Sequence, residues 1–580
     1  MDQKRLFVAI LISAVILISY QFLAVRFLPH PPPSKPTTQT TEPAPEAQAA
    51  AGPATSPAQQ AALAALKAAP RVAIVAPSVR GSISLLGARI DDVVLTKYRE
   101  TEAPTSPNVR LLDPGTSKRP YYVQYGWSAA PGEKVALPDN QTIWTASAET
   151  LSPGHPVTLS WANGAGLTFH IALTIDDNYM FGVTQSVTNA TGAPVALFPW
   201  MRVRRDYTPP SSGYYLLFEG MTGVAHDRLQ EMGYPKAKSN AKDKPGNVAY
   251  DATSKGGWAG FSDKYWLSAL IPDQSIPTTL RYRYIPGGEG HYQVDYVTAA
   301  AQTVAPGATE SLPSHMFAGA KVVNVLDKYE SQFHIPQFDK AVDFGWFYFL
   351  TKPIFYALDY LNALLGNFGL AIMAFTVLVK LLFFPLANYS YRSMSKMRLL
   401  APKIQAMRET YKDDPQKQQK EMMALYKAEK VNPASGCLPM VVQIPVFFSL
   451  YKDIFVTIEM RQAPFYGWIH NLSAVDPTNI FTLFGLIPWD PTAISPLLHL
   501  GALPILMGLT MFGQQKLNPA PPDPVQAKLF LFMPLIFTFM LARFPAGLVL
   551  YWTWNNLLSI AQQWVIMRRT RLSRPGLART

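Results

Sequence analysis

Apolar residues fill six long stretches of this chain, one at its start and five in its second half. The first stretch runs from Leu6 to Leu28, follows Lys4 and Arg5, and is long enough to cross about 30 Å of hydrocarbon. A cleaved signal sequence would have a shorter core and a small-residue exit, which this stretch lacks. We therefore expect residues 1–28 to be a retained transmembrane anchor whose basic start lies in the cytoplasm.

Two different kinds of sequence follow the anchor. Residues 29–70 consist mainly of Pro, Ala, Thr and Gln, which bury too little apolar surface to fold, so they predict a disordered linker. Residues 71–335 alternate short runs of β-branched and aromatic residues with Gly, Pro, Asn and Asp. This pattern predicts a large exported antiparallel β-sandwich, with strands such as Val157 to Trp161, Leu167 to Ile175, Phe181 to Val187 and Leu280 to Tyr284.

The second half predicts an α-helical membrane bundle. Residues 336–365 have the aromatic-rich pattern of an amphipathic helix at the membrane interface, with Phe344, Trp346, Phe347, Phe349 and Phe355. Residues 366–567 form the predicted five-helix core, which together with the anchor gives six transmembrane helices. The five spans are placed near Leu364 to Asn388, Leu438 to Thr457, Leu497 to Gln515, Leu529 to Leu541 and Leu548 to Met567.

The distribution of charge orients this bundle. The net charge is +12, and the loop from Asn388 to Lys430 holds ten Lys or Arg residues against five acids. The tail of residues 568–580 is also basic. Cytoplasmic loops carry such an excess, so we expect both termini inside and the β-sandwich in the periplasm of a bacterial inner membrane. The charge needs no sequence-specific nucleic acid, although the basic loop could meet ribosomal RNA.

Composition narrows the chemistry further. The single cysteine, Cys437, excludes an internal disulfide or a thiolate metal cluster, and the histidines show no metal-ligand spacing. The sequence has neither a phosphate-binding loop nor a dinucleotide fingerprint, so no cofactor is expected. Aromatic residues of the sandwich, such as Tyr214, Tyr215 and Trp258, could form a carbohydrate platform, but we favour core packing for them.

Polar residues inside the spans carry the main functional prediction. Lys380 lies about 12 Å from the cytoplasmic end of its span, too deep for its side chain alone to reach the interface. A charge there costs about 2.5 to 3.5 kcal/mol, and no span offers a buried acid at that depth. The same inner half of the bundle contains Gln443, Gln514, Gln515, Asn555, Asn556, Ser559, Gln562 and Gln563.

These positions predict a hydrophilic groove with a basic residue, open to the cytoplasm and closed outside. Asn555, Ser559, Gln562 and Gln563 share one helical face, which should look into the bundle. Such a groove suits the reception of polar parts of an incoming chain better than solute conduction, because no polar path continues outward. The alternative is that the amides only join helices to one another.

The cytoplasmic loop predicts a helical hairpin over residues 390–432. Its helices should run from Met394 to Tyr411 and from Pro415 to Lys430, with Asp414 as an N-cap. The hairpin is a candidate docking surface for apolar client segments, and packing inside the hairpin is the alternative. Its candidate docking residues are Met394, Met397, Lys403, Met407, Met422 and Met423.

Several motifs of this half closely resemble the YidC/Oxa/Alb family of membrane protein insertases, in its Gram-negative type. They are S-M-S-K-M-R-L-L-A-P-K-I-Q-A-M-R from Ser393, E-M-M-A-L-Y-K-A-E-K-V-N-P from Glu421, the segment Gly436 to Pro445, and F-P-A-G-L-V-L-Y-W from Phe544. The resemblance implies that the exported region is a β-supersandwich similar to sugar-binding folds. It also implies the helical hairpin and a cytoplasm-facing groove with one basic residue, here Lys380.

The resemblance extends to residue roles and partners. It implies that Thr376 and Trp552 line or stabilise the groove region, and that clients slide along helices bearing Ile444, Pro445 and Met540. The candidate client-contact residues are therefore Ile444, Pro445, Met540 and Trp552. The implied partners are nascent membrane proteins, the Sec translocon, the ribosome and targeting machinery, and inner-membrane lipids. Many members carry arginine where Lys380 stands. Two further features depart from the family pattern: the exported loop around Phe481 to Leu500 is longer than in some members, and a hydrophobic residue is common where Arg543 stands.

We therefore predict a membrane insertase and chaperone without covalent chemistry, acting alone or with the Sec translocon. No catalytic residue and no metal ligand is expected. One alternative is an intramembrane enzyme that uses Lys380 as a general base, although no serine is evidently paired with it. The other alternative is a membrane-anchored periplasmic glycan-binding protein.

Overall fold

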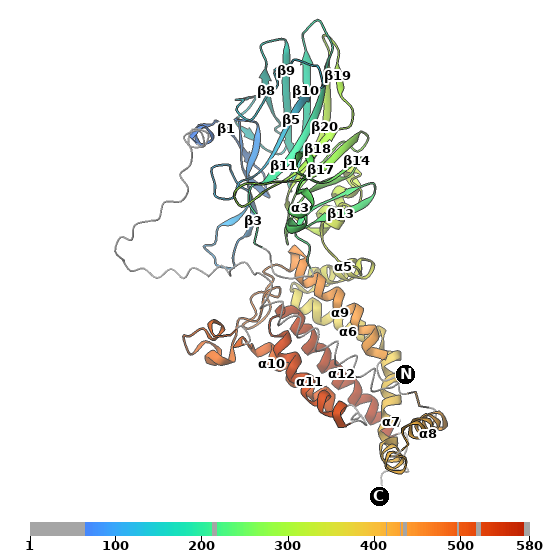
Figure 1. Ribbon diagram of the computed structural model, residues 1–580. Helices are drawn as coiled ribbons and strands as arrows, with labels where there is room; N and C mark the ends of the chain where they lie inside the picture. The colour runs from blue at the N-terminus through green and yellow to red at the C-terminus, as the bar shows by residue number, and fades with distance from the viewer. Residues whose placement is uncertain are drawn as a thin grey trace. The chain divides into compact units, whose positions relative to one another are not determined.

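The computed structural model describes residues 64–210, 217–412, 414–429, 431–432, 438–495, 498–517 and 524–572. The predicted anchor, most of the predicted linker, Tyr214, Tyr215 and Cys437 lie outside these residues. The described chain begins with a β-rich region and continues with a helical region (Figure 1).

The β-rich region contains two sheets, which confirms the predicted β-sandwich. The strand order is β14-β17-β18-β11-β5-β3-β2-β1-β7 in the larger sheet, where β4 pairs with β3 and β19 with β11, and β13-β12-β15-β16-β20-β10-β9-β8-β6 in the other. All pairs are antiparallel except β1 with β7. The strands are β1 Arg71–Val75, β2 Val79–Ser84, β3 Arg89–Arg99, β4 Asn108–Leu112, β5 Tyr121–Ala129, β6 Thr145–Ala146, β7 Thr150–Leu151, β8 Val157–Ala162, β9 Leu167–Ile175, β10 Met180–Asn189, β11 Val195–Arg205, β12 Gly220–Ala225, β13 Arg228–Met232, β14 Val248–Lys255, β15 Trp258–Ser262, β16 Trp266–Ile271, β17 Pro277–Ile285, β18 His291–Thr298, β19 Gln302–Val304 and β20 Thr309–Ala320.

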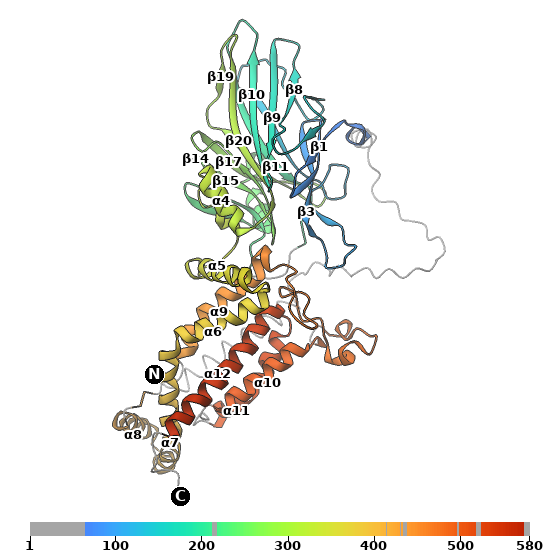
Figure 2. The ribbon, with the colours of Figure 1, turned by 180° about the vertical axis from the view of Figure 1, so that it is seen from behind.

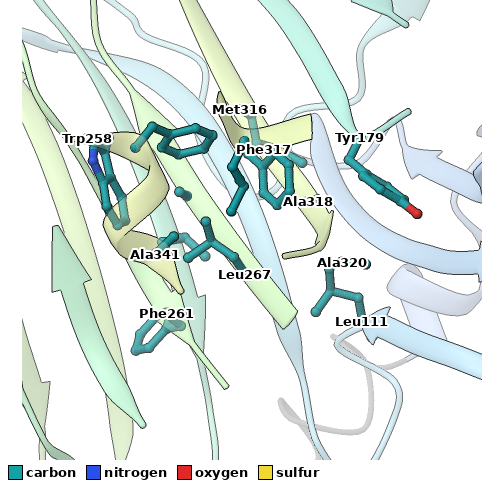
Figure 3. Close-up of a cluster of buried hydrophobic side chains, with 14 of the residues drawn as sticks. Leu111, Tyr179, Trp258, Phe261, Leu267, Met316, Phe317, Ala318, Ala320 and Ala341 are labelled. Carbon is teal, nitrogen blue, oxygen red and sulfur yellow. The ribbon is translucent and has the colours of Figure 1, made fainter. Parts of the chain in front are cut away.

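Alternating apolar residues build the core of this sandwich. Along β11 every second residue is buried, as expected for a strand that turns one face to a core. Trp258 is fully buried and its ring meets Phe338 edge-on, with centroids 5.3 Å apart. Figure 3 shows Trp258, Phe261 and Phe317 in this cluster. Trp258 therefore packs in the core and cannot serve as an exposed carbohydrate platform.

One charged side chain is sealed inside the sandwich. Arg205 is 1% exposed and donates two hydrogen bonds to the Asp263 carboxylate, at 2.8 and 2.7 Å. It also donates to the Tyr234 hydroxyl at 2.7 Å and lies over the ring of Tyr121. Burial alone would lower the pKa of Arg205, but the Asp263 carboxylate raises it well above its usual value.

The helical elements follow the sandwich apart from α3, which lies within it. They are α3 Tyr234–Ala241, α4 Val323–Phe333, α5 Tyr348–Leu365, α6 Phe368–Leu382, α7 Phe384–Thr410, α8 Pro415–Ala428, α9 Leu438–Val456, α10 Ala502–Leu517, α11 Pro524–Leu541 and α12 Ala546–Leu572. In both ribbon views α12 lies beside α10 and α6, and these pairs pack together (Figures 1 and 2).

Two predicted helices differ from the structure. The interfacial helix begins only at Tyr348, because the chain leaves helical geometry after the short turn Phe338–Ala341 and Gly345 has a positive φ of 74°. The predicted span from Leu364 to Asn388 is not one straight helix. It breaks at Phe383 between α6 and α7, where Pro385 stands in the first turn of α7 and cannot continue the backbone ladder of α6.

The later predicted spans coincide with α9 to α12. Among the described residues, no single helix combines the length and hydropathy needed to cross a membrane by itself. The pair formed by α6 and the first part of α7 meets these criteria together, across a bend of 67°. The number of transmembrane helices and their placement in a membrane thus stay predictions.

Candidate functional site

A pocket between α6, α7, α9 and α12 gathers several of the polar residues singled out in the sequence. It has about 530 Å³ of empty space, part of it open to solvent. Its polar lining comes from Thr376, Lys380, Gln443, Tyr391, Tyr551, Asn555 and Gln562, and its apolar lining from Val379, Phe383, Leu386, Ala387, Pro439, Val442 and Val446. The break at Phe383 lies in the wall of this pocket, so the bend shapes it.

Lys380 stands in the last turn of α6 and is half-buried. Its ammonium donates a hydrogen bond of 2.7 Å to the hydroxyl of Ser559 on α12. The expectation that no serine pairs with Lys380 is therefore wrong: α6 packs against α12 and brings together residues that are 179 positions apart. Within the described chain no carboxylate forms an ion pair with Lys380.

The hydroxyl of Ser559 is fully engaged. It accepts from Lys380 and donates to the backbone carbonyl of Asn555, one turn earlier on α12, at 2.8 Å. Ser559 is also 2% exposed. This arrangement holds an ammonium group in place and directs the proton of the serine into its own helix.

The polar face of α12 is shared between two neighbours. Asn555 and Gln562 line the pocket, but Gln563 turns toward α10, where its amide donates to the carbonyl of Leu517 at 3.0 Å. Asn556 likewise donates to Thr510 of α10, at 3.3 Å. These two residues act as polar contacts between helices. Gln514 on α10 does not belong to the pocket lining.

Several polar groups of the pocket lack strong partners. Both polar atoms of the Gln562 amide are buried, and neither finds a hydrogen-bond partner in the described chain. The Gln443 amide reaches only the hydroxyl of Tyr551, at 3.4 Å. The hydroxyl of Thr376 instead donates to the carbonyl of Ile372 in its own helix, at 2.6 Å. Buried amides without partners are costly unless water or another chain fills the pocket.

Two aromatic members of the pocket, Tyr391 and Tyr551, were not predicted from the sequence. Tyr391 lies on α7, just after the bend, and Tyr551 lies on α12. Tyr551 stands four residues before Asn555, so the helical period that groups Asn555 with Ser559 could have found it. Tyr391 has no such signal, because the bend that points it into the pocket was not predicted.

The four predicted client-contact residues lie in different environments. Ile444 on α9 and Met540 on α11 are 47% and 50% exposed, whereas Pro445 is half-buried. The ring of Trp552 packs against Phe447 of α9 and Phe537 of α11, at centroid distances of 4.5 and 6.1 Å. Trp552 of α12 thus contacts both α9 and α11. The exposed residues Ile444 and Met540 lie on these same two helices, each three residues from the ring that Trp552 contacts.

The helices α7 and α8 form the predicted hairpin. Leu400, Ile404, Tyr426 and Val431 build a small core, against which Met397 and Met422 pack. Met394 packs instead with Ala387, Tyr391 and Ile566, and Lys403 forms a 3.0 Å ion pair with Glu429. Met407 is half-buried and Met423 is 57% exposed. Packing therefore accounts for three of the five methionines.

Comparisons with known proteins agree over the whole chain. A family profile described as YidC periplasmic domain matches residues 71–357, and one described as 60Kd inner membrane protein matches residues 360–573. Two curated relatives, both described as Membrane protein insertase YidC, are those of Granulibacter bethesdensis, with 58% identity over 100% of both chains, and Acidiphilium cryptum, with 56% identity over 98% of both. A crystal structure described as an active YidC insertase has a TM-score of 0.35 and 16% identity, over 85% of this chain and 92% of that one, and is too distant to add to the argument.

Proposed function

Because the chain belongs to the YidC family of membrane protein insertases, we propose that it inserts nascent proteins into the bacterial inner membrane through the pocket around Lys380. The observation that carries the proposal is this pocket itself. Within the described chain it contains an ammonium group without a carboxylate partner and an unpartnered amide, and half of its lining side chains are apolar. Polar groups left without partners in such surroundings are typical of a binding site.

The pocket would hold polar segments of a client part-way across the membrane. Lys380 supplies a positive charge, Gln562 supplies a free donor and acceptor, and Gln443 supplies a weakly held amide. Each replaces part of the hydration that a client segment loses, and so lowers the cost of its transfer. Apolar client segments would then leave along the exposed residues Ile444 and Met540, driven by burial in lipid.

The remaining features of the proposal follow from the sequence. The chain crosses the inner membrane six times, with both termini in the cytoplasm and the β-sandwich in the periplasm. It acts as insertase and chaperone, alone or with the Sec translocon. The hairpin α7–α8 and the basic tail meet ribosomes and targeting machinery, and the exposed apolar side chains of the hairpin include Leu399 and Met423. The protein catalyses no covalent reaction and needs no cofactor.

The contact between Lys380 and Ser559 favours one competing function, an intramembrane serine–lysine hydrolase. In such an enzyme a neutral lysine accepts the serine proton. Here the Ser559 proton is donated to the Asn555 carbonyl, and the buried hydroxyl offers no access to a substrate. The geometry suits a charged lysine held by a hydroxyl acceptor, which supports insertion over hydrolysis.

Two substitutions separate these functions. Lys380→Arg keeps the charge, and Ser559→Ala keeps the charge but removes the hydroxyl. We expect both variants to insert a ribosome-stalled single-span client into proteoliposomes at more than about half the wild-type rate, since electrostatic attraction does not need a general base. Protease protection of the client measures insertion. Complete loss of insertion in both variants, with both folded, would favour the hydrolase.

A further inference from the structure

The segment between α9 and α10 displays an apolar surface that the pocket does not use. We call residues 480–495 the outer loop; they include the short helical turns Ile480–Gly485 and Pro491–Ala493. Asp490 is its only charged residue. Its exposed apolar side chains are Ile480, Phe481, Leu483, Phe484, Leu486, Ile487, Trp489 and Ile494, with Leu486 82% and Ile494 75% exposed. In Figure 1 the loop lies in the orange part of the chain, near the label α10.

Two consecutive residues of the outer loop have a strained backbone. Leu483 and Phe484 are consecutive and both have positive φ, 48° and 58°. This left-handed conformation is unfavourable for a bulky side chain, so two such residues in succession are retained only where hydrogen bonds or packing hold them. The structure places both side chains outward, 53% and 56% exposed, so no core packing compensates for the strain.

Several backbone N–H groups of the outer loop donate to acceptors in the loop or in Asn479, the residue before it. The backbone N–H groups of Phe481 and Phe484 donate to the side chain and the carbonyl of Asn479, at 3.1 and 2.9 Å. The N–H of Gly485 donates to the Thr482 hydroxyl and that of Ile487 to the Thr482 carbonyl, both at 3.0 Å.

The tryptophan of the loop is held in the same way. The indole N–H of Trp489 donates to the carbonyl of Phe481 at 2.9 Å. A loop surrounded by water could leave these donors to the solvent. Internal bonding of this kind is required where a loop enters an apolar medium, because a backbone group without a partner is costly there.

From these observations we infer that the outer loop inserts its apolar side chains into the outer leaflet of the inner membrane and anchors α9 and α10 there. The inference rests on the membrane placement in the proposed function, which puts this connection on the periplasmic surface. Lipid is the occupant that fits best, because the loop offers apolar side chains, a tryptophan suited to the interface and a single charge.

Fluorescent labels at single cysteines test the inference. In a Cys437→Ser background, Leu486→Cys carries an environment-sensitive dye, and the full-length protein is reconstituted into vesicles of phosphatidylethanolamine and phosphatidylglycerol. Two matched sites serve as controls: Leu535→Cys on α11, which is 56% exposed, and Ala165→Cys in the exposed turn between β8 and β9. Each label is quenched either by lipids spin-labelled near the headgroup or by aqueous iodide.

We expect the label at position 486 to be quenched at least about threefold more strongly by the spin-labelled lipid than by iodide, with the opposite preference at position 165. Lipid quenching at position 535 combined with iodide quenching at position 486 would overturn the inference and leave the proposed function intact. Iodide quenching at both positions would overturn the membrane placement as well. Quenching at position 486 that depends only on the protein-to-lipid ratio would instead assign the surface to a second copy of the chain.

A second variant tests whether the quenching by lipid depends on the apolar side chains of the outer loop. Leu483→Asp combined with Ile487→Asp places two charges on the same surface without touching the Asn479 and Thr482 hydrogen bonds. With the label still at position 486, the lipid quenching should fall at least about threefold, because charged side chains are expelled from the acyl region. Unchanged lipid quenching in this variant, with the β-sandwich folded, would contradict the inference.

Discussion

The β-sandwich and the helical region each bury a basic side chain, and they treat its charge differently. In the sandwich, Arg205 is met by both oxygens of Asp263 and by the hydroxyl of Tyr234. In the helical region, Lys380 meets one hydroxyl and an open pocket. A buried charge that is ion-paired to a carboxylate contributes to structure, whereas one that borders a pocket without a counter-charge is available to a ligand.

The largest effect should come from breaking the ion pair between Arg205 and Asp263. Arg205→Ala leaves Asp263 without its partner and should destabilise the sandwich by about 3–5 kcal/mol. Hydrogen exchange of β11 and β15 in the full-length protein measures this loss. The neighbouring Arg204→Ala is the matched control, since Arg204 is 24% exposed and its ion pair in the described chain is with Asp206, two residues further along. Equal losses of protection in the two variants would contradict the claim that the buried ion pair of Arg205 stabilises the sandwich more than an exposed ion pair does.

Substitution of Lys380 should change the rate of client insertion and not the free energy of unfolding. Lys380→Leu should lower the insertion of a client with an acidic translocated segment at least about tenfold, since a charge attraction worth about 1.4 kcal/mol is lost. A client with an uncharged translocated segment should lose less. Protease protection in proteoliposomes measures both, with Lys516→Leu at the exposed end of α10 as the control. Equal losses for the two clients would show that charge is not what Lys380 provides.

Two adjacent glutamines sharpen the contrast within α12. Gln563 has a backbone partner on α10, so Gln563→Leu should destabilise the helical region by about 1–3 kcal/mol. Gln562 has none, so Gln562→Leu should leave stability unchanged or raised and lower insertion about twofold to fivefold. Thermal unfolding in detergent and client insertion, measured on both variants, give the two readouts. Loss of stability in Gln562→Leu would place that amide among the structural contacts.

The smallest effect on insertion should come from removing the sandwich. Residues 71–320 span all the strands of the sandwich, from β1 to the end of β20. Their deletion should leave more than about a third of the insertion activity if the pocket carries out insertion. Adding Lys380→Leu to the deleted chain should still lower insertion of the acidic client. Abolished insertion in a deleted chain that is stably integrated would move the function to the periplasmic region and favour the glycan-binding alternative.

Local patterns explain which parts of the fold could be predicted. The strands β8, β9, β10 and β17 follow from alternation over a few residues, and α9 to α12 follow from apolar runs. The bend at Phe383 was missed because hydropathy continues through it, although Pro385 was visible. The start of the interfacial helix was misplaced because its aromatic residues extend beyond the segment that is helical.

The polar residues of the candidate site could be predicted from the sequence, but the contacts between them could not. Lys380, Gln443, Asn555 and Gln562 stand out because polar residues are rare in apolar segments. The bond from Lys380 to Ser559 depends on how α6 and α12 pack, which no local pattern contains. Gln562 and Gln563 differ by one residue and hence by about 100° around the helix, so one stripe can face both the pocket and α10.

The most direct test of the pocket is a photo-crosslinking scan with a ribosome-stalled single-span client in membranes. Probes replace Gln443 and Gln562 in the pocket, and a matched probe replaces Leu535, an exposed apolar residue of α11. The account predicts client adducts at both pocket positions, with few or none at position 535. Adducts at position 535 only, or none at the pocket while the client still inserts, would contradict the claim that the pocket around Lys380 receives the incoming chain.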